Sequence, residues 1–438
     1  MGTTVKLPDS LFRFLDRLSV RALNWSKQAG RGMTERRLAR GRPRSLWGVT
    51  PILTLPLKAR ADATLGFRSQ SIVYTTYVIT SGFDINLKAL VGAVYRVDAR
   101  LWQPLHRFIL AWALLRYDVF HTYADRGLLP PPERFGVDPS ELDAWRDAGK
   151  RVYVYAYGAD VRTRNKTLAL GKWNFCVDCP EPVKFCICDD ETGSRIMAQT
   201  ASRVTALVSL GDMLTYMPGA KHVAYWPIDL AKIVQSPATT GDGPLRIAHA
   251  PNHMHFKGSH YLEEAVERLR AEGHAIEYVK VQGVPNTQVL ELFGKADVVA
   301  DQFIGGAYGY TALEALALGK PVLTYVRSPD LVLASDECPF LNVTPERIED
   351  SLRWLLANRE KLASIGQQGR RYVERWHSIE AVGDRLGSLY EETADFPEAT
   401  RARVSDARAK ECSRRDAIAQ IGDWRHPWVV TSKNEFSL

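Results

Sequence analysis

Apolar residues in the second half of the chain recur with two different spacings. Short apolar stretches predict strands at 245–250, 276–281, 297–300 and 321–326, and amphipathic stretches predict helices between them at 261–271, 287–293 and 311–318. In the first of these helices Leu262, Ala265, Val266 and Leu269 share one face. A repeated strand–helix unit of this kind predicts a Rossmann-like domain with a parallel sheet.

The first half shows the same alternation less clearly. Residues 45–78 read as a strand, a loop and a second strand centred on 72–77, and further strands are expected at 114–121 and 151–157, with a helix at 101–115. These segments predict a second open, doubly wound sheet. The small, polar and Pro/Gly residues of 236–243 indicate a hinge between the two halves.

The predicted organisation has four parts. We expect an N-terminal extension at 1–45, a first Rossmann-like domain at 46–235, a second at 244–380, and a C-terminal helix and tail at 381–438 that is a candidate for crossing back onto the first domain. A chain of 438 residues with 45% hydrophobic residues can bury two cores of this size. It has no apolar run of about 18 residues and no secretory leader pattern, which favours a cytoplasmic location.

The net charge of +7 is concentrated at the N-terminus. Residues 1–45 contain eleven basic and three acidic residues, a local charge of +8 that leaves about −1 for the remaining chain. A nearly neutral body argues against a broad surface for nucleic acid. We therefore expect no nucleic-acid partner.

The same basic segment is amphipathic. Arg13, Arg17 and Arg21 recur every four residues, and a set of apolar residues shares another face of the predicted helix: Leu11, Phe12, Leu15, Leu18 and Ala22. Two interpretations stay open. The helix lies on an anionic membrane surface, or it packs its apolar stripe on the body with the arginines in solvent.

A glycine-rich loop joins the strand 297–300 to the helix near Thr311. Gly305, Gly306 and Gly309 let a ligand approach the backbone, and the amides and dipole at a helix start bind phosphate without side chains. The segment ends in Gly319-Lys320-Pro321-Val322 before the next strand.

This segment resembles the donor-binding signature of the retaining GT-B glycosyltransferases, the family called glycosyl transferases group 1. In that family a Glu-x7-Glu motif precedes an Ala-x-Gly-x-Pro-Val helix end. Here Glu314 matches the second acid, whereas Gly306 stands at the position of the first. The resemblance implies an α/β fold of two Rossmann-like domains facing a cleft, with Glu314 on the nucleotide ribose and with Asp301 or Gln302 as candidates for the missing sugar contact.

Two further segments resemble that family. Lys257-Gly258, after the strand 245–250, corresponds to a lysine that neutralises the donor diphosphate; the accompanying arginine is absent, and Asn252, His253 or His255 are candidate hydrogen-bond donors. A metal site or plain loop polarity is the alternative explanation of these histidines. The turn at Gly283 resembles one that contacts the nucleotide base.

The resemblance in the first half is carried by Tyr157-Gly158-Ala159-Asp160-Val161-Arg162, which is similar to a His-Gly-x-Asp-x-Arg segment facing the cleft. Asp160 either orients an acceptor hydroxyl or the donor sugar, or caps a helix. His121 is either a cleft residue or a structural histidine. The family's early glycine-rich loop is replaced by Thr50–Pro56.

These matches select the candidate residues. The catalytic candidates are Asp160, His121 and Lys257. The candidates for donor binding are Glu314, Lys257, Asn252, His253, Gly283, Asp301, Gln302, Tyr308, Gly309, Tyr310 and Thr311.

Four of the six cysteines, Cys176, Cys179, Cys186 and Cys188, lie within thirteen positions. Clustered thiols in a cytoplasmic protein favour a structural zinc ion, with free thiols or a redox pair as the alternative.

The sequence therefore predicts a hexosyltransferase-like retaining glycosyltransferase that moves a sugar from a nucleotide-diphosphate sugar to a glycan, lipid-linked or small-molecule hydroxyl, without a catalytic metal. The alternatives are a non-catalytic nucleotide-sugar-binding protein and a GT-B nucleotide-sugar epimerase. A nucleic-acid-binding role of residues 1–45 would show as steep salt dependence.

Overall fold

A computed structural model describes residues 6–77, 80–177, 179–223, 226–237 and 243–417. The N-terminal domain contains a parallel sheet in the order β3-β2-β1-β4-β5-β6-β7. Its strands are β1 (Arg44–Val49), β2 (Arg68–Val73), β3 (Ile85–Asn86), β4 (Val119–Tyr123), β5 (Arg151–Tyr155), β6 (Ala206–Ser209) and β7 (Lys221–His222). Its helices are α1 (Asp9–Ala39), α2 (Leu55–Ala63), α3 (Lys88–Val97), α4 (Trp102–Arg116), α5 (Pro139–Asp147), α6 (Arg164–Leu168) and α7 (Asp190–Ala201).

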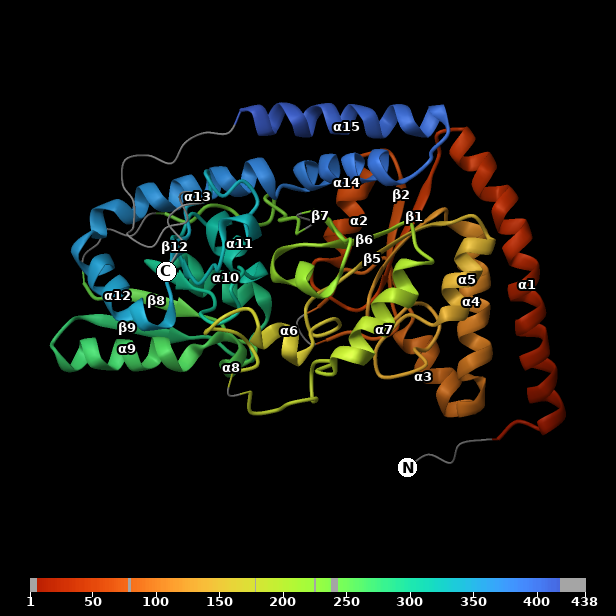
Figure 1. The fold of residues 1–438 in the computed structure, drawn as a ribbon, viewed down its shortest axis with the longest axis horizontal. Helices are drawn as coiled ribbons and strands as arrows, with labels where there is room; N and C mark the ends of the chain where they lie inside the picture. Colours follow the sequence, from red (N-terminus) through yellow and green to blue (C-terminus); the bar gives the residue numbers. More distant parts are fainter. Residues whose placement is uncertain (1–5, 78–79, 178, 224–225, 238–242, 418–438) are drawn as a thin grey trace.

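The C-terminal domain has a second parallel sheet, in the order β12-β11-β10-β8-β9. Its strands are β8 (Leu245–His249), β9 (Ile276–Lys280), β10 (Val298–Ala300), β11 (Val322–Thr324) and β12 (Leu341–Asn342). Its helices are α8 (Met254–Lys257), α9 (Ser259–Ala271), α10 (Asn286–Gly294), α11 (Tyr310–Ala317), α12 (Ile348–Ala357) and α13 (Leu362–Trp376). Figure 1 shows the two domains side by side.

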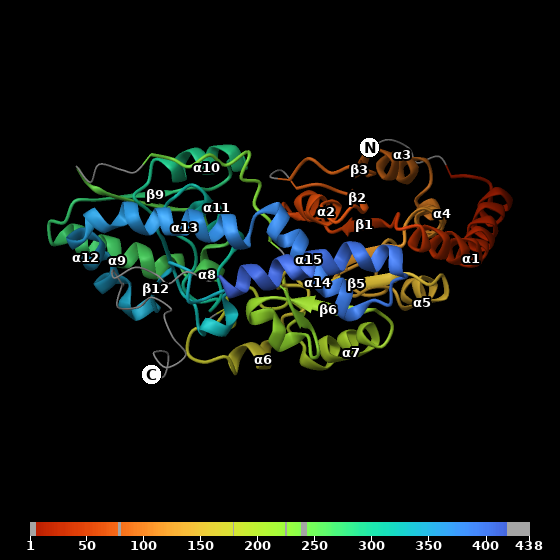
Figure 2. The ribbon, with the colours of Figure 1, turned by 90° about the horizontal axis from the view of Figure 1, so that it is seen from above.

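Two crossings of the chain connect the domains, and they lie next to each other. The Ile228 amide donates to the His377 carbonyl over 2.7 Å, and Nδ1 of His377 lies 3.0 Å from the Trp226 carbonyl oxygen. After the second crossing α14 (Ile379–Thr393) packs against α2, and α15 (Glu398–Asp416) covers α14, so these two helices lie on the N-terminal domain (Figures 1 and 2). Residues 238–242 of the expected hinge and 418–438 of the expected tail are outside the described residues.

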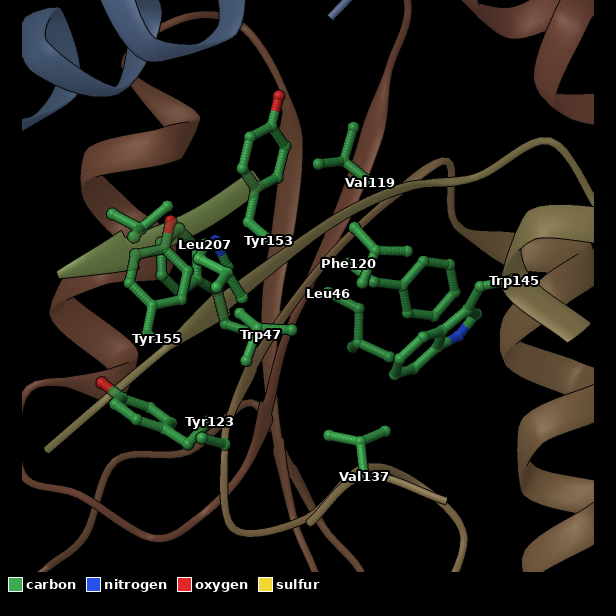
Figure 3. Packing of buried hydrophobic residues seen from close by; sticks show 14 of the residues in the cluster. Leu46, Trp47, Val119, Phe120, Tyr123, Val137, Trp145, Tyr153, Tyr155 and Leu207 are labelled. Carbon is green, nitrogen blue, oxygen red and sulfur yellow. The ribbon is translucent and has the colours of Figure 1, made fainter. Parts of the chain in front are cut away.

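Aromatic side chains dominate the core of the N-terminal domain. Every residue of β4 is buried, as a strand covered on both faces requires, and Trp47, Tyr153 and Tyr155 are completely buried beside it (Figure 3). Tyr390 of α14 joins this core through hydrogen bonds to Asp62 and His121, each 2.8 Å long. Residues from both ends of the chain therefore build one core.

Most predicted elements are present, with three corrections in the first half. The second strand, expected around 72–77, is β2 at Arg68–Val73. Residues 55–63, expected as loop, form α2, which Pro56 permits because proline is tolerated in the first turn of a helix. The strand expected at 114–121 begins at Val119, because α4 continues to Arg116. Among the described residues, no helix is long and apolar enough to cross a membrane.

Candidate functional site

Two adjoining cavities lie between the domains, at the carboxyl ends of the parallel strands. The larger cavity, of about 640 Å³, is lined from the N-terminal domain by the segment after β1 and by Tyr123 and Tyr157, and from the C-terminal domain by Asn252, Gly283 and α11. The second cavity, of about 540 Å³, shares Tyr77, Tyr157, Trp226 and Asn252 with the first. Open α/β sheets bind ligands at this edge, where strand order reverses.

Glu314 of α11 lines the larger cavity although its side chain is only 5% exposed. Its Oε1 accepts a hydrogen bond of 2.9 Å from Nδ2 of Asn286, which also lines the cavity. Burial raises the pKa of Glu314 to about 7, the charge of Asp301 acts in the same direction, and the bond from Asn286 opposes both. A buried carboxylate at this place can accept hydrogen bonds from a pair of ligand hydroxyls.

For the nucleotide ligand that the family resemblance implies, this pKa predicts pH-dependent binding. Ligand hydroxyls favour the ionised carboxylate, and about one unit below its pKa only roughly a tenth of Glu314 is ionised. We expect the dissociation constant to fall roughly tenfold from about pH 6 to about pH 8 in calorimetric titrations. The nucleotide phosphate also titrates in this range, so the same series with Glu314→Gln supplies the background. An identical pH dependence in both proteins would contradict this role.

Lys257 ends the short helix α8 and is held by Asp301. Nζ of Lys257 lies 2.6 Å from Oδ1 of Asp301, whose Oδ2 accepts a 2.6 Å bond from the Gly309 amide. Asp301 is buried and lines neither cavity, whereas Lys257 and Gly309 line the second. Asp301 therefore positions the lysine and the glycine loop. It does not supply the sugar contact that the sequence analysis considered.

Gln302 is also engaged within the protein. Its Oε1 accepts from the Gly305 amide, and its Nε2 donates to the carbonyls of Ala307 and Tyr325. Gln302 lines the second cavity, but its polar atoms fix the shape of the glycine loop.

Arg327 occupies the space that an acid at position 306 would need. Gly306 has φ +76°, and a Cβ atom there would collide with the guanidinium of Arg327. That guanidinium donates to the carbonyls of Trp173 at 3.2 Å and Gly305 at 3.3 Å. The loss of the first motif acid thus goes together with a cation that ties the glycine loop to the N-terminal domain.

Placing a glutamate at position 306 is expected to destabilise the folded protein. Because the left-handed backbone and the Arg327 contact both disfavour a side chain, Gly306→Glu should lower the free energy of unfolding by about 1–3 kcal/mol. Gly82 is the matched site, with φ +80° and open space around its missing Cβ. Thermal unfolding should show a larger loss for Gly306→Ala than for Gly82→Ala. Equal losses would mean that Arg327 moves aside freely.

The structure brings the predicted donor-binding residues together. The larger cavity is lined by Asn252, Gly283, Tyr310, Thr311 and Glu314, and the second by Asn252, His253, Lys257, Gln302, Tyr308 and Gly309. Only Asp301 of the predicted set lies behind the walls. Helix α11 begins at the larger cavity, and its first amides have no partner within the helix.

Asp160 is completely buried beneath the cavity wall formed by Tyr157 and Ala159. Its Oδ1 accepts bonds of 2.9 Å from the amides of Tyr157 and Gly158, so the side chain holds the turn after β5. Burial, followed by the charge of Asp125, raises the pKa of Asp160 to about 8. Asp160 therefore shapes the backbone turn; it does not cap a helix, since Thr163 precedes α6.

His121 lies in the core of the N-terminal domain, and its position does not support the catalytic interpretation. The ring stacks on Trp47 at a centroid distance of 3.7 Å, Nδ1 lies 2.9 Å from the Tyr155 hydroxyl, and Nε2 lies 2.8 Å from the Tyr390 hydroxyl. Burial, helped by Lys58, lowers the pKa of His121 well below its usual value. The residue is a neutral structural histidine that neither cavity reaches.

The cysteine-containing loop crosses the cleft to the C-terminal domain. Phe185 packs on His253 with ring centroids 4.8 Å apart, and the Phe175 carbonyl oxygen lies 3.4 Å from Nε2 of His255. Cys176, Cys179, Cys186 and Cys188 are free thiols. Within the described ranges no three His, Cys, Asp or Glu side chains are grouped to hold a metal ion, so the zinc site stays a prediction.

Several cavity residues were not among the candidates selected from the sequence, although Arg162 belongs to the segment that resembles the family's cleft motif. Arg162 stacks on Phe175, with its guanidinium carbon 4.1 Å from the ring centroid, and lies 3.7 Å from buried Asp212. All three line the second cavity. Asn286 and Trp226 likewise became visible only through the fold.

Comparison with known proteins bears on this geometry. Residues 245–372 match the family model of glycosyl transferases group 1. The matched segment contains Lys257, the glycine loop and Glu314, so the group 1 signature and the cavity walls coincide. No curated protein sequence matches the chain significantly.

Solved GT-B structures share the fold across both domains. Anabaena Alr3699/HepE, solved in complex with UDP-glucose, is similar with a TM-score of 0.50 and 11% identity over 80% of this chain and 99% of that one. The sucrose-phosphate synthase of Thermosynechococcus elongatus is similar with a TM-score of 0.52 and 15% identity over 80% and 98%. These likenesses confirm the predicted GT-B fold of two Rossmann-like domains. Together with the group 1 match, they support a glycosyltransferase.

Proposed function

We propose that this protein is a retaining glycosyltransferase of the hexosyltransferase type, which transfers a sugar from a nucleotide-diphosphate sugar to an acceptor hydroxyl. The observation that carries the proposal is the placement of Glu314, Lys257 and the start of α11 around adjoining interdomain cavities. All three lie inside the segment that matches the group 1 model. An acid for ribose, a cation for diphosphate and free helix amides form a suitable set for a nucleotide-sugar.

The two cavities divide the substrates in this proposal. The nucleoside occupies the larger cavity, with its base at Gly283 and its ribose hydroxyls on Glu314. The diphosphate lies between Lys257 and the first amides of α11. The acceptor enters the second cavity, whose walls of Tyr157, Phe175 and Phe185 suit the apolar face of a sugar ring.

In the transfer step, the bond between the sugar anomeric carbon and the diphosphate oxygen breaks as the acceptor oxygen bonds to that carbon from the same face. The acceptor proton passes to the departing phosphate oxygen, which then needs no protein base. Lys257 stabilises the negative charge that gathers on the diphosphate. Closure of the domains excludes water. No catalytic metal ion takes part.

Calorimetric titration with UDP, GDP, ADP and dTDP tests the donor site. Micromolar binding of one nucleotide is expected and would identify the base; UDP is the first to test, because the similar Alr3699/HepE was solved with UDP-glucose. Failure of all four to bind would overturn the proposal. Once an acceptor is found, NMR of the product shows its anomeric configuration. An inverted product would contradict the retaining mechanism but not the proposed sugar transfer.

One observation favours a second candidate, a non-catalytic nucleotide-sugar-binding protein. Gly306 stands where group 1 enzymes carry the first acid, and Arg327 fills its place. Tight nucleotide binding without hydrolysis or transfer from any donor would select this candidate. Conversion of the donor sugar to an epimer would select the GT-B epimerase alternative.

A further inference from the structure

Helix α1 packs on the body through its small and polar side chains. The buried residues on α1 are Ser19, Ser26, Gly30, Thr34 and Leu38. At Gly30 a Cβ atom would lie 2.6 Å from the Leu114 carbonyl oxygen of α4, so the helices approach too closely for a larger residue. Polar bonds fix the seam, among them Thr34 to Asp118 at 2.8 Å and Arg37 to Asp118 at 2.6 Å.

Four large apolar side chains of α1 form an exposed stripe. Leu11, Phe14, Leu18 and Trp25 are 42%, 54%, 41% and 61% exposed. Their spacing of three, four and seven residues places them in one stripe along the helix. Of the apolar residues that one of the two interpretations packs on the body, Leu11 and Leu18 are exposed, whereas Phe12, Leu15 and Ala22 are half-buried.

A row of arginines lies on the solvent side next to this stripe. Arg13, Arg17 and Arg21 are exposed, and none makes an ion pair with any described residue. Other basic residues at the seam are used differently, since Arg37 pairs with Asp118 and Arg107 of α4 pairs with Asp16. Within the described ranges, three arginines that make no ion pair therefore lie beside four exposed apolar side chains.

Helix α3 adds a second exposed apolar element at the same end of the molecule. None of its residues is buried, and Leu90, Tyr95 and Val97 are 47%, 57% and 45% exposed. Asp98, directly after α3, accepts a 3.0 Å bond from the Leu7 amide, which fixes the end of α3 to the start of α1. Both views show α3 beside the N-terminal end of α1 (Figures 1 and 2).

We propose that this face, consisting of Leu11, Phe14, Leu18, Trp25, Arg13, Arg17 and Arg21, docks on the surface of an anionic phospholipid bilayer. Arginines pair with lipid phosphates while the aliphatic and aromatic side chains enter the interface beside them. Charge complementarity disfavours a second copy of the chain as occupant, because a two-fold contact would set the same arginines against each other.

The test is co-sedimentation of the full chain with vesicles, without nucleotide or sugar, so that its result is independent of the proposed transfer. Vesicles of phosphatidylcholine and phosphatidylglycerol in equal parts should bind the protein, and phosphatidylcholine alone should bind it weakly. Replacing Arg13, Arg17 and Arg21 with glutamate should reduce binding roughly 100-fold, because each basic residue at the surface is worth about fivefold. Phe14→Ser and Trp25→Ser should each reduce it roughly tenfold.

The matched control reverses three exposed basic residues on α15, Arg401, Arg408 and Lys410, and changes the net charge by the same amount. This control should bind anionic vesicles nearly as well as the parent protein. Equal losses of vesicle binding in both triple variants would show that binding depends only on net charge and would overturn the proposal. A dimer in light scattering that Trp25→Ser dissociates, without vesicle binding, would instead show an interface between copies. Circular dichroism establishes that each variant is folded.

Discussion

Lys257→Ala is expected to lower kcat by roughly 100- to 1000-fold, the usual cost of removing one group that stabilises charge developing in a transition state. Asp301 holds the ammonium group 2.6 Å away at the wall of the second cavity. Because the diphosphate becomes more negative as the sugar leaves, most of the loss should fall on kcat, with a smaller rise in KM. Steady-state kinetics with a saturating acceptor measure both quantities.

Two further variants make this result specific. Lys295→Ala removes an exposed lysine from the same domain and should leave kcat unchanged. Asp301→Asn keeps Lys257 but removes the charge that positions it, so its kcat should fall by a smaller factor. A Lys257→Ala enzyme that turns over normally would show that the leaving diphosphate lies elsewhere.

Glu314→Ala is expected to weaken nucleotide binding by roughly 10- to 150-fold, because charged hydrogen bonds to the ribose hydroxyls are worth about 1.5–3 kcal/mol. The carboxylate is buried at the cavity wall, where water cannot replace it easily. Calorimetry with the nucleotide that the wild type binds measures the change. Asn286→Ala, which removes the hydrogen bond from Nδ2 of Asn286 to Oε1 of Glu314, should give a smaller loss of affinity.

Glu291→Ala is the matched control, since Glu291 is an exposed glutamate on α10 of the same domain. Its dissociation constant should equal that of the wild type. If Glu314→Ala also binds like the wild type, the ribose does not contact Glu314, and the donor would have to bind in another orientation.

The C-terminal domain could be predicted well because its signals are local in sequence. The strands, the glycine loop and Glu314 follow one another between Leu245 and Val322, and parallel strands bring their carboxyl ends to one edge. All predicted donor-binding residues except Asp301 consequently line a cavity. Asp301 is the exception because the side chain of a residue after a strand can point behind the cavity wall as well as into the cavity.

Long-range contacts explain what the sequence could not predict. His121 was expected at the end of a strand near the cleft, but it lies within β4, and Tyr390, 269 positions later, binds its Nε2 in the core. The absence of a side chain at Gly306 is explained in the same way by a distant residue, since the Arg327 guanidinium occupies the space of its missing Cβ. Spacing along the chain holds no information about such partners.

The return of the C-terminal helices to the first domain has a consequence for folding order. The C-terminal domain is one continuous segment, whereas the core of the N-terminal domain includes Leu386, Leu389 and Tyr390 from α14. During synthesis the first domain, although begun earlier, cannot complete its core until almost the whole chain has been made. The C-terminal domain can fold while the core of the N-terminal domain is still incomplete. This is the reverse of the usual N-terminal-first order.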